Sequence, residues 1–162
     1  MGTNGTTMTP EGLVIRRATE ADLGRAVELL VLGAVPGGPP RAEDAADLEP
    51  YVAALREVDD TGGAVLVAEL DGEVIGLCQL IVFRHLQSRG GRCAELESVH
   101  VHPDHRGTGV GGALVRDAIA RARALGCYRV QLTSNAVRQD AHRFYEGLGL
   151  APSHVGFKMR LG

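Results

Sequence analysis

One segment constrains this chain more than any other: a strand-like run that stops at a proline and continues through glycines into a long helix. We expect a strand at 93–101, ended by Pro103, and then the turn Arg106-Gly107-Thr108-Gly109-Val110-Gly111-Gly112. From there to Gly126, apolar residues recur at helical spacing, which predicts a helix. Backbone N–H groups at such a helix start converge on one point, where the helix dipole also favours an anion. The segment therefore predicts a phosphate-binding turn.

Two common phosphate motifs do not match this turn. A Walker loop requires Lys and then Ser or Thr after its last glycine, whereas Ala113 and Leu114 follow Gly112. A dinucleotide-binding fold places its glycines after an early strand of a parallel sheet. Here two predicted helices and a hairpin come first. The alternative to a phosphate-binding role is that the glycines serve only to make a turn.

The remaining chain alternates predicted strands and helices on both sides of the turn. Before the turn we expect a strand at 13–15, helices at about 19–32 and 42–58, antiparallel strands at 64–70 and 74–83 joined by Asp71-Gly72, and a polar loop at 87–92. After the turn we expect a strand at 128–133, a helix at 139–146 and a last strand at 157–161. These elements predict one domain over residues 12–162, preceded by a disordered tail over residues 1–11.

Composition excludes several classes of protein. The 162 residues include 23% charged residues and carry a net charge of −3 with a single lysine, Lys158, which argues against a nucleic-acid partner. The longest apolar run, Val74–Phe83, is too short to span a bilayer, and the first ten residues show no secretory pattern. We therefore expect a cytoplasmic protein without a membrane partner. The three cysteines, Cys78, Cys93 and Cys127, are expected to be free thiols.

The order of these elements, together with the turn, resembles the GCN5-related N-acetyltransferase (GNAT) superfamily over about residues 13–161. Arg106-Gly107-Thr108-Gly109-Val110-Gly111 matches that family's acetyl-CoA pyrophosphate motif, Q/R-x-x-G-x-G/A, at every defined position. Phe144-Tyr145-Glu146 also matches, although Leu150 stands where the family commonly has Phe. The string from Ser134 to Tyr145, followed by Ser153-His154, is most similar to the aminoalkylphosphonate N-acetyltransferase branch.

The resemblance implies an α/β (α+β) fold with a mixed, mostly antiparallel sheet of six to seven strands, splayed in the middle and flanked by about four helices. It implies acetyl-CoA as cosubstrate and a small-molecule amine as acceptor, with an aminoalkylphosphonate as the narrower expectation. The resemblance leaves open whether the protein forms a homodimer. The residues that the resemblance assigns to acetyl-CoA are Val99, Val101, Arg106, Gly107, Thr108, Gly109, Val110, Gly111, Gly112 and Asn135.

Acetyl transfer to an amine needs a group that takes the amine's proton, because an alkylammonium has a pKa of about 10. Glu95 and Glu97 project on one face of the predicted strand before the turn, where the family has bases or residues that hold a water chain. The sequence does not show which of the two glutamates acts as the base. The alternative for either residue is that it has no catalytic role and is solvated or ion-paired. Tyr145 matches the family's tyrosine that protonates the leaving thiolate, with a half-buried structural tyrosine as its alternative.

Other interpretations stay open at this point. A protein or peptide amine is the rival acceptor, and a non-catalytic acyl-CoA-binding module is the rival function. That module would keep the turn but need no catalytic glutamate or tyrosine. A metal site is an alternative for His100, His102 and His105, of which His100 and His102 lie on one face of the predicted strand and could share an ion. We nevertheless expect no functional metal, because the family uses this stretch to approach the cofactor turn. The basic residues that could meet a phosphonate acceptor are Arg41, Arg84, Arg89 and Arg92, each of which could equally be a solvated surface arginine.

Overall fold

The computed structural model describes residues 9–34 and 42–161. Within these residues one sheet is formed by β1 (Val14–Arg17), β2 (Ala64–Leu70), β3 (Glu73–Arg84), β4 (Arg92–Val101) and β5 (Cys127–Leu132), in that order. The strands from β1 to β4 are antiparallel to their neighbours, whereas β4 and β5 run parallel. The expected mixed, mostly antiparallel fold class is confirmed.

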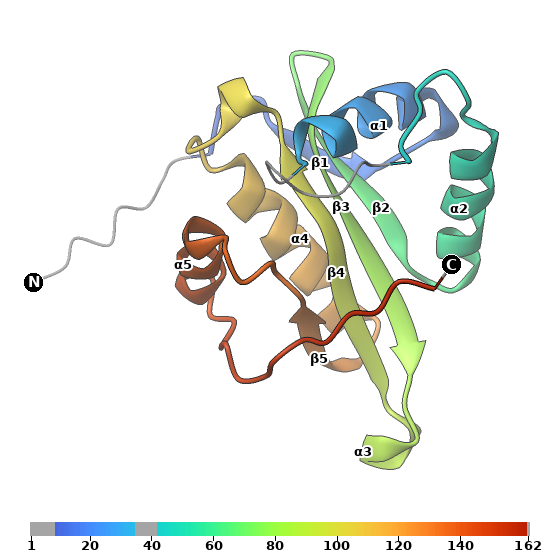
Figure 1. Cartoon of the computed structure of the whole chain (residues 1–162), viewed down its shortest axis with the longest axis vertical. Coiled ribbons are helices and arrows are strands. Elements are labelled where there is room, and N and C mark those ends of the chain that lie inside the picture. Colours follow the sequence, from blue (N-terminus) through green and yellow to red (C-terminus); the bar gives the residue numbers. More distant parts are fainter. Residues whose placement is uncertain (1–8, 35–41, 162) are drawn as a thin grey trace, which may run out of the picture.

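Helices cover both faces of this sheet (Figure 1). They are α1 (Leu23–Leu32), α2 (Glu49–Asp60), α4 (Val110–Ala124), α5 (Gln139–Gly147) and the single turn α3 (Gln87–Gly90). The turn α3 lies in the expected polar loop, and its Ser88 and Arg89 have φ angles of 52° and 59°. No helix in the described part of the chain is long and apolar enough to cross a membrane.

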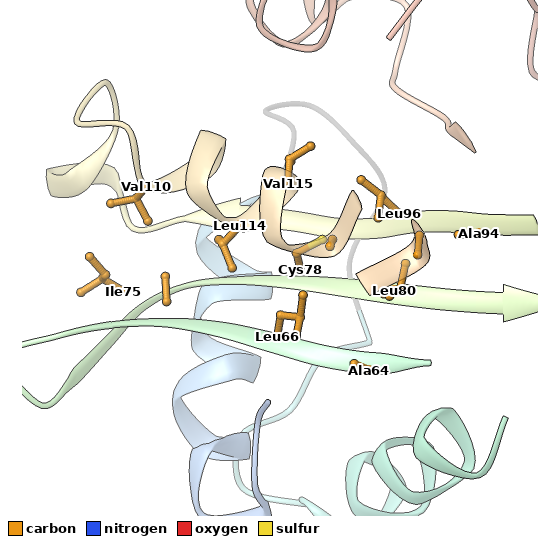
Figure 2. Packing of buried hydrophobic residues seen from close by; sticks show 13 residues of the cluster. Ala64, Leu66, Ile75, Cys78, Leu80, Ala94, Leu96, Val110, Leu114 and Val115 are labelled. Atoms are coloured by element: carbon orange, nitrogen blue, oxygen red, sulfur yellow. The ribbon is translucent and has the colours of Figure 1, made fainter. Parts of the chain in front are cut away.

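Two apolar cores lie on opposite faces of the sheet. The core under α4 joins Leu114, Val115 and Ala118 to alternate residues of the strands, such as Leu66, Cys78, Leu80 and Leu96 (Figure 2). The other core joins Leu29 of α1 and Leu55 of α2 to Val67 and Leu77. Because successive side chains of a strand point to opposite faces, β2 and β3 supply residues to both cores.

Several local predictions are confirmed. Asp71 and Gly72 both have positive φ, 52° and 81°, as a tight hairpin turn between two strands requires. At the start of the first helical segment, the Asp22 carboxylate accepts hydrogen bonds from the Thr19 N–H at 2.7 Å and from the Thr19 hydroxyl at 2.9 Å. This capping box leads through a short 3-10 turn into α1.

Other predictions are wrong. The predicted helix at 42–58 begins only at Glu49, because the Asp44 and Asp47 carboxylates accept hydrogen bonds from the N–H groups of Ala46 and Glu49 and fold the preceding residues into turns. Residues 157–161 form no strand, and the described sheet has five strands rather than six or seven. Residues 1–8 of the expected tail lie outside the described residues, whereas the Leu13 N–H donates to the Pro10 carbonyl in a turn.

Candidate active site

The sheet opens where β5 ends. The parallel pairing of β4 with β5 runs from Arg92 opposite Cys127 to Leu96 opposite Leu132. Beyond Leu96, β4 continues to Val101 beside β3, so its other edge faces the gap that β5 leaves. Figure 1 shows β4 extending well past the short β5. The splay that the family resemblance implies is therefore present, and Glu97 is the first residue of β4 within it.

A bulge in β4 changes which side chains face each core. Gln79 of β3 lies opposite Glu97 and Leu77 lies opposite His100, so Ser98 and Val99 together oppose one residue of β3. Ser98 takes the positive φ of 52° that this bulge requires. Ala94 and Leu96 face the α4 core before the bulge, and Val99 and Val101 pack against the same core after it. The apolar residues of this strand change from even positions to odd positions at the bulge, and this change is the sequence signal that indicates it.

The glycine turn has the geometry expected of an anion site. Gly107 and Gly109 have φ angles of 75° and 88°, and Gly109 caps the N-terminus of α4 without a side-chain hydrogen bond. The first N–H groups of a helix have no partner within it, so those of α4 are available to a ligand. The Thr108 hydroxyl donates to the His105 carbonyl at 2.6 Å, and the Arg106 side chain donates to the Val101 carbonyl at 3.1 Å. These two bonds stabilise the shape of the turn, and its free N–H groups suit an anion.

The glycines at the start of α4 also allow close packing. A Cβ atom on Gly111 would lie 3.4 Å from Phe144 Cζ of α5 and 3.6 Å from Val101 Cγ2 of β4. A Cβ atom on Gly112 would lie 3.0 Å from the Arg116 guanidinium. A larger residue at Gly111 would therefore push against α5, which carries Tyr145.

The two glutamates have different surroundings. Glu95 lies in the paired part of β4, and its carboxylate accepts a hydrogen bond from the Gln131 side-chain amide of β5 at 2.9 Å. Glu97 is half-buried at the opening, and burial is the main cause that raises the pKa of its carboxyl. Glu95 raises that pKa further and Lys158 lowers it. The structure therefore separates two residues that the sequence could not rank.

Tyr145 is held by α5 beside this opening. Its ring packs edge-to-face against Phe144, with ring centroids 5.0 Å apart, and contacts the α4 core. Burial raises the pKa of its phenol, and the Glu97 charge raises it as well. The phenol is thus protonated at neutral pH and lies within electrostatic range of Glu97.

The end of β5 brings further polar groups to the gap. The Ser134 hydroxyl oxygen is buried without a hydrogen-bond partner in the part of the chain that the structure describes. The Asn135 side-chain oxygen accepts a hydrogen bond from the Val137 N–H at 3.1 Å, which stabilises the turn into α5. A buried polar group without a partner is rare in proteins, so the Ser134 hydroxyl is a candidate to bond a ligand. The sequence prediction included Asn135 but not Ser134, whose burial no sequence signal reveals.

The histidines near the turn do not form a metal site. The described residues contain no group of three or more His, Cys, Asp or Glu side chains that could hold a metal ion. His100 lies against the end of α1, where a Cβ atom on Gly33 would overlap its ring. The His102 ring nitrogen accepts a hydrogen bond from the Asp104 N–H at 3.4 Å and so caps the turn before the glycines.

Comparison with known proteins identifies the family. The family model described as the acetyltransferase (GNAT) family matches residues 35–150. An aminoalkylphosphonate N-acetyltransferase of Salmonella typhimurium is 35% identical over 91 residues, which cover 56% of this chain and 58% of that protein. A glucosamine 6-phosphate N-acetyltransferase of Trypanosoma brucei brucei is 33% identical over 138 residues, which cover 85% of this chain and 88% of that protein.

A solved structure has the same fold. It comes from Bacillus halodurans C-125, is described as a transcriptional regulator, and is 37% identical with a TM-score of 0.84 over 92% of this chain and 99% of that chain. The matched family model and the trypanosome relative agree with each other. The chain belongs to the acetyltransferase (GNAT) family.

Proposed function

We propose that this protein transfers the acetyl group of acetyl-CoA to the primary amine of a small molecule, by direct attack in a ternary complex. GNAT acetyltransferases use acetyl-CoA as the acetyl donor. The observation that carries the proposal is the end of β4–β5 pairing at Leu96, which opens the sheet beside the half-buried Glu97. The proposed catalytic unit is residues 12–162.

In this proposal the turn and the start of α4 hold the cosubstrate. The free N–H groups at residues 107–112 would bind its pyrophosphate, because the α4 dipole and the glycine backbone favour an anion there. Between the turn and the opening, the cosubstrate would pass Val99, Val101 and Asn135. The Ser134 hydroxyl would donate to a polar group of the bound chain. When bound, acetyl-CoA supplies an acetyl group activated as a thioester.

Glu97 would take the proton of the acceptor amine, directly or through a water chain. Its raised pKa makes it a stronger base than an exposed glutamate. Glu95 is the weaker candidate, because its carboxylate is already bonded to Gln131. Tyr145 would protonate the leaving thiolate, since burial keeps its phenol protonated.

The experiment that tests this function measures thiol release from acetyl-CoA with a panel of small amines, aminophosphonates and peptides. Thiol release that depends on one small amine supports the proposal. Release only with peptides would favour a protein acceptor. Tight acetyl-CoA binding without release for any acceptor would favour the non-catalytic module.

An aminoalkylphosphonate acceptor is the narrower alternative, suggested by the Salmonella relative. It would need a cation near Glu97. Arg84 and Arg92 instead donate to the carbonyls of Gly90 and Leu125, at 2.9 and 3.1 Å. With Arg89, they lie around the hairpin between β3 and β4, at the end of β4 far from the glycine turn, and Arg41 lies outside the described residues. The charge of Lys158 lowers the pKa of Glu97, so Lys158 is the cation that could meet a phosphonate there.

A homodimer is the proposed assembly. Val155, Phe157, Met159 and Leu161 are between 79% and 95% exposed and alternate along an extended segment. Alternate apolar residues are typical of a strand with one buried face, and β5 is an edge strand of the described sheet. This segment is therefore suited to pair with a second copy of the chain.

A further inference from the structure

An apolar space lies between α1, α2 and the sheet. This space, here called the helix pocket, has a volume of about 90 Å³. Its walls are aliphatic side chains of both helices, among them Val27, Leu30 and Leu55, and its floor is formed by residues of β2, β3 and β4. A cavity of about 150 Å³ can hold benzene, so about 90 Å³ is enough for roughly four carbon atoms.

The helix pocket has no charged lining residue among the residues that the structure describes. Its polar groups are Tyr51, Gln79 and Ser98. The Tyr51 hydroxyl already accepts a hydrogen bond from the Asp44 N–H at 3.0 Å, outside the apolar wall. A phosphonate or carboxylate in this pocket would lose its water without gaining a cation, which is costly. The lining favours an uncharged aliphatic group.

The polar side of the helix pocket borders the candidate base. Gln79 lies directly opposite Glu97 on the neighbouring strand, so both side chains lie on the same face of the sheet. Ser98, which follows Glu97, lines the pocket as well. An amine whose alkyl chain enters the pocket would thus leave its nitrogen near the Glu97 carboxylate.

We propose that the helix pocket binds the alkyl chain of the acceptor, and that the acceptor is a primary amine with a short uncharged aliphatic chain of about four carbons. The inference rests on the proposed acetyl transfer and specifies its substrate class. It assigns substrate selection to α1 and α2, and it places the aminoalkylphosphonate among the poor acceptors.

The test compares ethylamine, n-butylamine, n-hexylamine and 2-aminoethylphosphonate as acceptors. Each buried methylene contributes about 0.8 kcal/mol, so kcat/KM should rise about fourfold per methylene, or about 15-fold from ethylamine to n-butylamine. n-Butylamine should also exceed 2-aminoethylphosphonate. A flat chain-length profile, or a preference for the phosphonate, would overturn the inference while the acetyl transfer itself stands. If none of these four amines is acetylated but another amine of the wider panel is, this inference fails and the proposed function stands. If no amine of the wider panel is acetylated, the proposed function fails.

Two neighbouring alanines of α2 provide a variant and its matched control. Both are exposed, but only Ala54 lines the helix pocket, whereas Ala53 does not. Ala54→Phe should fill the pocket and bring the n-butylamine to ethylamine ratio of kcat/KM towards one, and Ala53→Phe should leave that ratio unchanged. Leu30→Ala should enlarge the pocket and move the preference towards n-hexylamine. An unchanged ratio in Ala54→Phe would contradict the assignment.

Discussion

Glu95 and Glu97 show how one strand gives two identical side chains different chemistry. Both point to the same face of β4, but only Glu97 lies beyond the last pair with β5. Glu97 is half-buried, and this burial raises its pKa because it disfavours the charged form. The sequence predicts the pair, because their spacing is local. It could not rank them, because the end of β4–β5 pairing depends on where β5 stops.

We predict different pH profiles for Glu97→Gln and Glu95→Gln. Without Glu97, the rate at neutral pH should fall about 10²- to 10⁴-fold and recover as the pH approaches the amine's own pKa of about 10. Glu95→Gln should change the rate much less. The measurement is kcat/KM for the best amine across the pH range. If Glu95→Gln alone removes the acidic limb, the roles are reversed, and if neither single variant nor the double variant alters it, another group takes the proton.

Loss of stability cannot explain the expected effect of Glu97→Gln. The folded-state pKa of Glu97 is raised, so its contribution to stability declines as the pH rises from the unfolded pKa through the folded one. At neutral pH the glutamine variant should therefore unfold at the same or a higher temperature than the natural protein. Thermal unfolding at pH 7 checks this directly.

A second prediction at this scale concerns Tyr145. Tyr145→Phe keeps the ring that packs against Phe144 but removes the proton donor. We expect kcat to fall about 10²-fold or more, with acetyl-CoA affinity within a few fold of the natural protein. Calorimetry gives the affinity, and single-turnover kinetics show whether chemistry limits the rate. Unchanged turnover under that condition would assign Tyr145 to packing alone.

The helix α4 is the element that sequence predicts best and that the site depends on most. Its apolar period and its glycine start are local signals, and so is the Asp71-Gly72 pair. The helix and the hairpin turn that they predict are confirmed. The start of α2 was missed because the Asp44 and Asp47 turns compete with a helix over the same residues. The helix pocket could not be predicted, since it arises where helices distant in sequence from β4 meet the sheet.

We predict that Gly111→Val weakens acetyl-CoA binding severely. The valine Cβ would be in van der Waals contact with Phe144 at 3.4 Å, and its two methyl groups would need further space at the start of α4, where the pyrophosphate is proposed to bind. The dissociation constant is measured by calorimetry on the folded variant. Gly24→Val in α1 is the control, because a Cβ atom there has no neighbour within 4 Å. Unchanged affinity in folded Gly111→Val would exclude the pyrophosphate site from this turn.

At the scale of the whole molecule, the segment 155–161 has the pattern of a strand but no neighbouring strand. The sequence predicts a strand at 157–161, and the structure leaves the alternating side chains of Val155, Phe157, Met159 and Leu161 exposed. A strand also needs backbone hydrogen bonds from a neighbour, which the alternation of a single segment cannot supply. The sequence therefore shows the apolar alternation of a strand but does not show which strand would pair with it.

We predict that two copies of the chain associate through this segment. Light scattering during size-exclusion chromatography should report a dimer for the natural protein. Phe157→Ser with Met159→Ser should shift it towards the monomer, because it removes two side chains that are 95% and 83% exposed. Val137→Ser, at an exposed position on another segment, is the control. A monomeric natural protein at high concentration would contradict the proposed assembly.

The most direct test of the account follows the acetyl group itself. The protein is mixed with acetyl-labelled acetyl-CoA and the best small amine, and the labelled amine and the free thiol are measured together by mass spectrometry and a thiol reagent. We predict equal amounts of N-acetylated amine and thiol, formed much more slowly by Glu97→Gln and Tyr145→Phe. Thiol released without labelled amine, or label found only on the protein, would contradict it.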